Sequence, residues 1–284
     1  MTGFPASDVK TADLNGVTLA YREIGFGHPL ILINGFASPM DTWNPPVLSL
    51  LAQTFRVIVF DNRGTGYSSA SEDPFSIPLF ASDTTALMDA LGISHARILG
   101  LSMGASIAQE LVLAHPERVE RLVLAAGTCG GPEMVPMQKE TWDRLADKSG
   151  SPAEVADRMF SVLFPKEWLA THDPWQYCPE VHETTSEDNA ERQAAAFFGW
   201  KGSWERLPEI RCPALVITGT EDRVIPPENS RILASRIPGA RRAEIPGAGH
   251  GMQYQCPQEF TDRVIRFLQG REITVTAQDE QESE

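Results

Sequence analysis

The chain has 284 residues, of which 42% are apolar and 22% are charged, the composition of an ordinary globular protein. Its 24 basic and 38 acidic side chains give a formal net charge of −14, which repels phosphate backbones and anionic lipid, so we expect no nucleic-acid partner. The longest apolar runs have five residues, far below the roughly 20 that a membrane span needs, so we expect no membrane span either.

The first 130 residues alternate between short aliphatic runs and helical patterns. Residues 17–22 alternate with period two and predict an early antiparallel strand. Four later runs are continuous and aliphatic, as in parallel strands that are buried on both faces: residues 30–33, 57–60, 97–99 and 122–124. Helices are predicted between them over residues 43–53, 80–91 and 103–115. This order predicts an α/β fold with a doubly wound, mostly parallel sheet.

No buried-strand pattern occurs between residues 131 and 208, where helices are predicted over 135–148, 152–163 and 186–200. Strand patterns then return at 214–217 and 242–245, and helical patterns at 228–236 and 257–269. We therefore expect one core built from residues 1–130 and 209–271, with residues 131–208 inserted as a helical cap or lid. Residues 272–284 form an acidic tail that we expect to be disordered.

The predicted insert is rich in aromatic side chains. Most of them are expected to build its own small core, since aromatic residues are mainly packing material. Some are expected to line an apolar pocket above the core, and Trp168, Phe197 and Phe198 are our candidates for contact with a substrate.

The pentapeptide Gly100-Leu101-Ser102-Met103-Gly104 carries the strongest chemical signal. It follows a predicted strand and opens a predicted helix, which is the context that gives the G-x-S-x-G motif its meaning. A sharp turn there places the serine at its apex with strained dihedral angles, so its neighbours two residues away must be small. The helix that follows directs free N–H groups toward the same point. Ser102 is therefore the candidate nucleophile.

A serine hydroxyl needs a general base, and His250 is the best candidate among six histidines. It lies in Gly247-Ala248-Gly249-His250-Gly251, between the last predicted strand and the last predicted helix, and the glycines allow close approach of another loop. The base in turn needs a carboxylate to orient it. Asp222 follows the strand at 214–217, at the strand end where open α/β sheets place their sites, and Glu221 is its adjacent rival.

The order Ser102, Asp222, His250, each after a strand, resembles that of the α/β-hydrolase family, and the resemblance covers about residues 14–270. Two further segments are similar to the family's motifs. Leu30-Ile31-Leu32-Ile33-Asn34-Gly35-Phe36 resembles its strand followed by an HG-type loop, and Asp61-Asn62-Arg63-Gly64-Thr65-Gly66-Tyr67-Ser68 resembles its D-x-R-G-x-G-x-S turn. The insert lies where the family carries its lid.

The resemblance implies that the backbone N–H groups of Phe36 and Met103 form an oxyanion hole. Asn34 departs from the family, which mostly has histidine there; it either changes hydrogen bonding under the loop or directs an amide toward the substrate, so Asn34 is a candidate substrate contact. We interpret Asp61 and Arg63 as a buried ion pair that holds their turn.

The expected reaction is acyl transfer from a small or medium-sized apolar ester or lactone through an acyl-enzyme. Carboxylesterases, enol-lactonases, antibiotic methylesterases and C–C bond hydrolases all resemble this sequence, as do cofactor-free haloperoxidases, so perhydrolysis and C–C cleavage stay open. We call the turn at Gly100–Gly104 the elbow. A serine at its apex argues against the haloalkane dehalogenases and epoxide hydrolases of this fold, which use aspartate there. A ligand receptor with slow turnover is the alternative from another class.

Several expectations concern what is absent. No H-E-x-x-H, no Cys/His cluster, no phosphate-binding G-x-x-x-x-G-K-[ST] and no proper G-x-G-x-x-G motif occurs, so we expect no metal and no cofactor. The N-terminus lacks a basic start followed by an apolar stretch, so no signal peptide is predicted. The four cysteines are scattered without a C-x-x-C pair, which favours a reducing compartment and a cytoplasmic location. The sequence is silent on the oligomeric state.

Overall fold

The computed structural model describes residues 8–273. Within them, eight strands form one sheet in the order β1-β2-β4-β3-β5-β6-β7-β8. Their bounds are β1 Lys10–Leu14, β2 Val17–Ile24, β3 His28–Ile33, β4 Phe55–Phe60, β5 Ala96–Leu101, β6 Val119–Ala125, β7 Ala214–Gly219 and β8 Arg241–Ile245. Strands β3 to β8 run parallel, while β2 pairs antiparallel with both β1 and β4. The predicted α/β fold class is confirmed.

The sequence analysis missed strand β1, which forms a hairpin with β2. Asn15 and Gly16 join the two strands with positive φ angles of 48° and 74°. Such a two-residue Asn-Gly connection is the strongest short signal for a hairpin in a sequence. The alternation of β1 is weak because none of its five residues is fully buried, and only the turn identifies it.

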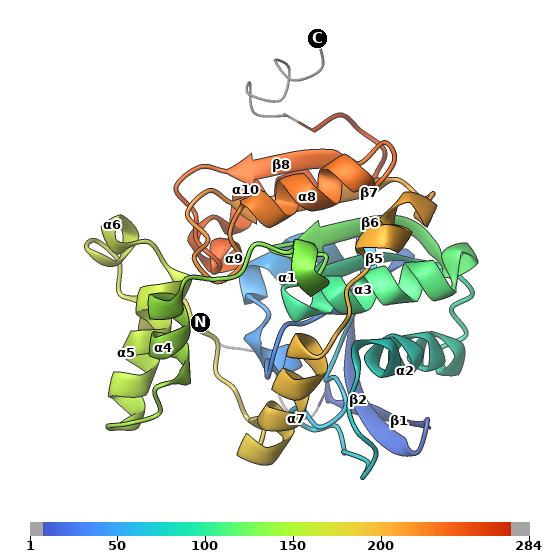
Figure 1. Ribbon diagram of the computed structural model, residues 1–284. Coiled ribbons are helices and arrows are strands. Elements are labelled where there is room, and N and C mark those ends of the chain that lie inside the picture. The colour runs from blue at the N-terminus through green and yellow to red at the C-terminus, as the bar shows by residue number, and fades with distance from the viewer. Residues whose placement is uncertain (1–7, 274–284) are drawn as a thin grey trace.

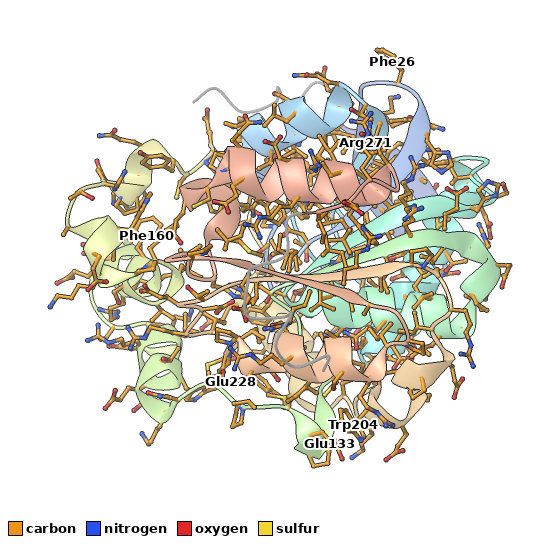
Figure 2. The ribbon with its side chains drawn as sticks, turned by 90° about the horizontal axis from the view of Figure 1, so that it is seen from above. Phe26, Glu133, Phe160, Trp204, Glu228 and Arg271 are labelled. Atoms are coloured by element: carbon orange, nitrogen blue, oxygen red, sulfur yellow. The ribbon has the colours of Figure 1, made fainter. Side chains whose placement is uncertain are left out.

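Helices cover both faces of the sheet (Figures 1 and 2). Helices α2 (Ile77–Ala90), α3 (Met103–Ala114) and α8 (Glu228–Arg236) pack on one face, together with Ile31, Ile98 and Leu124 of the central strands. Helices α1 (Pro45–Ala52), α9 (Met252–Gln255) and α10 (Pro257–Leu268) pack on the other, where Leu32, Leu99 and Val123 point. Both faces of the central strands are thus buried, which is why these strands read as unbroken aliphatic runs.

Helix α2 begins three residues earlier than predicted. Ser76 accepts a hydrogen bond from the Leu79 N–H with its side-chain oxygen, and Pro78 occupies the first turn. Both are ordinary start signals of a helix. The prediction started from the apolar pattern at residue 80 and so overlooked the cap.

Between β6 and β7 the chain forms helices and helical turns but no strand. The four helices are α4 (Lys139–Ala146), α5 (Pro152–Leu163), α6 (Lys166–Leu169) and α7 (Glu187–Phe198). Figure 1 shows α4, α5 and α6 standing off to one side of the core, while α7 lies close to it, and Phe160 marks the same insert in Figure 2. Of the predicted tail at residues 272–284, residues 274–284 lie outside the described residues. Within residues 8–273 no helix is both long and apolar enough to span a membrane.

The turn after β4 is held differently from our prediction, which paired Asp61 with Arg63. Arg63 instead forms a bidentate ion pair with Asp83 of α2, with both N···O distances at 2.7 Å. Asp61 accepts backbone N–H groups from Met40 (2.6 Å) and Tyr67 (2.8 Å). The ion-pair prediction was therefore wrong: each side chain is buried, but each ties the turn to a different neighbour.

Burial gives Asp61 an unusual titration. Desolvation raises the pKa of this carboxyl from 3.8 to about 7, against the opposing effect of the Met40 and Tyr67 N–H groups. Between those two values the folded protein keeps a proton that the unfolded chain has released. The contribution of Asp61 to the free energy of unfolding therefore falls as the pH rises through this interval.

We predict that Asp61→Asn removes this component of the pH dependence. Urea denaturation of the wild type and of the variant at several values between pH 4 and 8 tests it. The wild type should lose stability relative to Asp61→Asn as the pH rises, since only the wild type must release the buried proton. A difference between the two proteins that stays constant, or that grows in favour of the wild type, contradicts the prediction.

Candidate active site

Ser102 lies at the junction between β5 and α3, where the sequence predicted a sharp turn. Its φ of 57° and ψ of −121° are strained values for a residue with a side chain. The Ser102 N–H donates to the carbonyl of Ala125 at the end of β6, 2.9 Å away. The turn therefore raises Ser102 at the carboxyl edge of the sheet, where parallel strands end.

Two glycines make this turn sterically possible. A Cβ atom at Gly104 would lie 2.0 Å from the carbonyl oxygen of Ile33, and one at Gly100 would lie 2.3 Å from the carbonyl oxygen of Gly104. Helix α3 thus starts directly against the end of β3. Ser102 meets the loop after β3 as a result: a Cβ at Gly35 would come within 3.2 Å of the Ser102 Cβ.

The structure brings Asp222 and His250 into contact from the loops after β7 and β8. His250 Nδ1 and Asp222 Oδ2 are 2.8 Å apart, and the Asp222 side chain is fully buried. The other carboxylate oxygen, Oδ1, accepts the N–H groups of Val224 and Ile225, both at 2.9 Å. One oxygen is thereby fixed by the backbone, and the other is left to orient the imidazole.

The two loops are also joined through their backbones. The Glu221 N–H donates to the carbonyl of Ala248 (2.8 Å), and the Thr220 N–H to that of Ile245 (3.1 Å). Glu221, the rival of Asp222, is exposed to solvent.

Within residues 8–273 the Ser102 hydroxyl makes no hydrogen bond, so it is not hydrogen-bonded to His250 in this structure. Catalytic hydrogen bonds often tighten only when substrate is bound.

The backbone N–H groups of Phe36 and Met103 lack an acceptor within the described residues. Met103 is the first residue of α3, whose initial N–H groups have no partner inside the helix. Phe36 lies in the loop after β3. Unpaired donors of this kind, one from each side of a serine, are what an oxyanion hole requires.

Asn34, a predicted substrate contact, is tied into its own loop. Its amide nitrogen donates to the Pro39 carbonyl (2.9 Å) and the Thr42 hydroxyl (2.8 Å), while its oxygen accepts the Gly35 N–H (2.9 Å). The residue is buried. The amide is occupied at both ends within its own loop, which agrees with a role in the hydrogen bonding of that loop, while contact of Asn34 with a substrate stays a prediction.

Trp168 takes part in an aromatic cluster of the insert. It stacks on Phe164 and on His172, with ring centroids 4.7 Å and 4.6 Å apart. Phe164, in turn, packs against Gly251, where a Cβ would lie 2.4 Å from its ring. The Gly251 N–H donates to the carbonyl of Leu163 (3.0 Å). The residues after α5 are thus docked on the loop that carries His250 through Phe164, and contact of Trp168 with a substrate stays a prediction.

Phe197 and Phe198 border a groove of about 560 Å³ between the end of α7 and residues 130–136. Phe198 is 54% exposed, and its ring meets that of Trp142 edge-on at 5.1 Å. Ser102, Asp222 and His250 are not among the lining residues of this groove. The structure therefore does not bring these two phenylalanines together with the triad, and their contact with a substrate stays a prediction.

The sequence analysis missed the part that Gln193 and Thr185 play. Both contact the loop that carries Phe36 from more than 140 residues away in the chain. A single glutamine in a helical pattern carries no signal for such a contact.

Within the described residues no group of three or more His, Cys, Asp or Glu side chains is arranged to hold a metal ion.

Comparison with known proteins agrees with this geometry. Residues 28–257 match the model of the alpha/beta hydrolase fold family. The chain is 32% identical over 260 residues to a Caulobacter sp. (strain K31) protein named "Putative carbamate hydrolase RutD", covering 88% of this chain and 96% of that protein. It is 31% identical to "Putative non-heme bromoperoxidase BpoC" of Mycobacterium tuberculosis (strain H37Rv), covering 89% and 98%.

Among solved structures, the enol-lactonase of Burkholderia xenovorans LB400 superposes with a TM-score of 0.78 at 29% identity, over 92% of this chain and 100% of that one. A family match over most of the chain agrees with the observed sheet. The chain belongs to the α/β hydrolase fold family and is a hydrolase of that superfamily.

Proposed function

We propose that the protein is a serine hydrolase that cleaves carboxylic esters or lactones of small to medium-sized apolar acids through an acyl-enzyme. The observation that carries the proposal is the 2.8 Å contact between His250 Nδ1 and a fully buried Asp222, on loops at the same edge of the parallel sheet as the strained Ser102. A buried carboxylate facing one imidazole nitrogen fixes the tautomer and leaves the other nitrogen to act as the base.

In the proposed reaction the Ser102 oxygen attacks the carbonyl carbon while His250 Nε2 takes its proton. Asp222 stabilises the imidazolium that forms. The negative charge that develops on the carbonyl oxygen is bound by the free N–H groups of Phe36 and Met103. His250 then protonates the leaving alcohol, or the ring oxygen of a lactone, and water releases the acid in the second half of the cycle.

The choice of esters and lactones has two supports. The loops contacting the site present apolar and aromatic side chains, with Phe36 43% exposed and Phe164 packed on the histidine loop. The similarity to an enol-lactonase agrees with this choice. The carbamate named for the RutD relative is also an acyl compound, which the same triad would attack in the same way.

The first prediction from this proposed function concerns the nucleophile. Ser102→Ala should lower the turnover of p-nitrophenyl butyrate by about a thousandfold or more, because no other hydroxyl lies at the elbow. A serine-directed phosphonate should add its mass to the wild type at Ser102 and leave Ser102→Ala unlabelled. Undiminished turnover by a folded Ser102→Ala protein refutes the assignment.

The second prediction uses the two adjacent acids as a matched pair. Asp222→Asn should lower kcat by about 10³- to 10⁴-fold, since the amide favours the wrong imidazole tautomer. Glu221→Gln, which changes an exposed side chain by the same chemistry, should leave kcat within about twofold. Equal losses in the two variants, measured with circular dichroism as the check on folding, contradict the role given to Asp222.

A second candidate activity is perhydrolysis, in which hydrogen peroxide replaces water in the second half of the cycle. The observation that favours it is the 31% identity with the protein named as a bromoperoxidase. Steady-state rates on one ester, with and without peroxide, separate the two activities. A peracid yield well below the yield of free acid at equal acyl-enzyme flux assigns hydrolysis as the main reaction.

A further inference from the structure

The inserted helices hold the loop that carries Phe36. The Ala37 N–H donates to Gln193 Oε1 over 2.8 Å, and the Thr185 hydroxyl donates to the Ala37 carbonyl over 3.0 Å. Gln193 lies within α7, and Thr185 lies just before it. One segment of the insert therefore binds both peptide groups that flank Ala37.

The remaining polar groups of this loop are bound within the core. The Gly35 N–H donates to Asn34 Oδ1, and the Gly35 carbonyl accepts the Ser38 N–H. The Phe36 carbonyl accepts the Ser38 hydroxyl at 3.0 Å. Within residues 8–273, every peptide N–H and C=O from Gly35 to Ala37 then has a partner except the Phe36 N–H. The hydrogen bonds of the loop thus single out one donor and leave it free.

Contacts from outside are needed because the loop is strained. Ala37 has a φ of 50°, in the left-handed region that residues with a side chain rarely adopt. Without Gln193 and Thr185, the N–H and the C=O of Ala37 would lose their partners, and the loop could relax toward ordinary backbone angles. Rotation of the Phe36–Ala37 backbone would redirect the Phe36 N–H.

Gln193 is itself firmly placed. It is completely buried, and its Nε2 donates to the hydroxyl of Thr65 at 2.6 Å. The preceding residue, Arg192, donates to the carbonyls of Ser71 (2.5 Å) and Asp73 (2.7 Å). Helix α7 is therefore anchored to the core independently of its contact with Ala37. The Gln193 side chain acts as a fixed support for the loop.

The geometry points to Gln193 and Thr185 as positioning residues: through Ala37, the insert sets the orientation of the Phe36 N–H and so completes the oxyanion hole. This inference rests on the proposed function, because it assigns the Phe36 N–H to a developing oxyanion. Neither residue touches the reacting atoms. Their effect should therefore be felt in stabilisation of the tetrahedral intermediate and not in the affinity for the substrate.

The test is Gln193→Met, which keeps the length of the side chain and removes both hydrogen bonds. With p-nitrophenyl butyrate, kcat should fall about tenfold or more, below the hundredfold to thousandfold loss of a whole oxyanion donor, while KM stays within about twofold. The dissociation constant of an alkyl boronic acid, whose adduct with Ser102 places an oxygen in the hole, should rise by the same factor as kcat/KM falls.

The matched control is Gln109→Met. Gln109 is also completely buried, and it bonds the carbonyls of Ala105 and Thr128 and the hydroxyl of Ser203. Its loss should lower the thermal midpoint comparably but leave kcat and boronate affinity within about twofold. Equal kinetic effects of the two methionine variants would show that Gln193 acts only through general stability, which overturns the inference.

Variants of Thr185 give a second test of the inference, without a change to a fully buried side chain. Thr185→Val removes the hydroxyl with little change of shape and should lower kcat about threefold to tenfold at constant KM. Thr185→Ser keeps the hydroxyl and should retain wild-type kinetics. If Gln193→Met fails to fold, Thr185→Val alone decides, and an unchanged kcat in that variant counts against the inference.

The same assays separate this inference from the proposed function. If Ser102→Ala keeps its activity, the proposed function fails. If Ser102→Ala is inactive while Gln193→Met and Thr185→Val keep the wild-type kcat, only the role of the insert fails.

Discussion

The arrangement of the site depends on one close approach, that of the first turn of α3 to the end of β3. Gly104 allows the helix to start against the carbonyl of Ile33, where any side chain would collide. That contact fixes the position of Ser102 relative to the loop that begins at Asn34. Because the helix starts there, its first N–H, that of Met103, has no acceptor within residues 8–273. A strained serine, a free helix N–H and a neighbouring loop are therefore consequences of the same packing contact.

The rest of the site is built by complete pairing of polar groups. Asp222 has one oxygen held by backbone N–H groups and the other in contact with His250. In the loop after β3, Asn34 binds three neighbouring groups, and Ala37 is bound by the insert. Because buried polar groups are costly when unpaired, each loop is restricted to a single conformation. Within residues 8–273, the N–H groups of Phe36 and Met103 stay without an acceptor.

Much of this was predictable because it is local or repetitive. The buried strands, the elbow at Gly100–Gly104 and the segments around Asp222 and His250 each lie within a few consecutive residues, and the fold class that they predicted is confirmed. Contacts between distant segments were not predictable. Arg63 binds Asp83 instead of Asp61, and Ala37 is bound by Gln193 of a helix far along the chain. Partner choice of this kind depends on how elements approach one another, which neither spacing nor composition records.

The insert is joined to the core on two sides of the site. The residues after α5 dock on the histidine loop through Leu163 and Phe164, and α7 docks on the loop of Phe36 through Gln193. The stretch that runs from β6 through α4 and most of α5 contacts neither the histidine loop nor the loop of Phe36 through these attachments. Exchange, shortening or lengthening of that stretch would therefore leave both attachments in place, together with the groups proposed to perform the chemistry. Such a modular layout makes residues 139–160 the natural place for laboratory changes to the proposed lid.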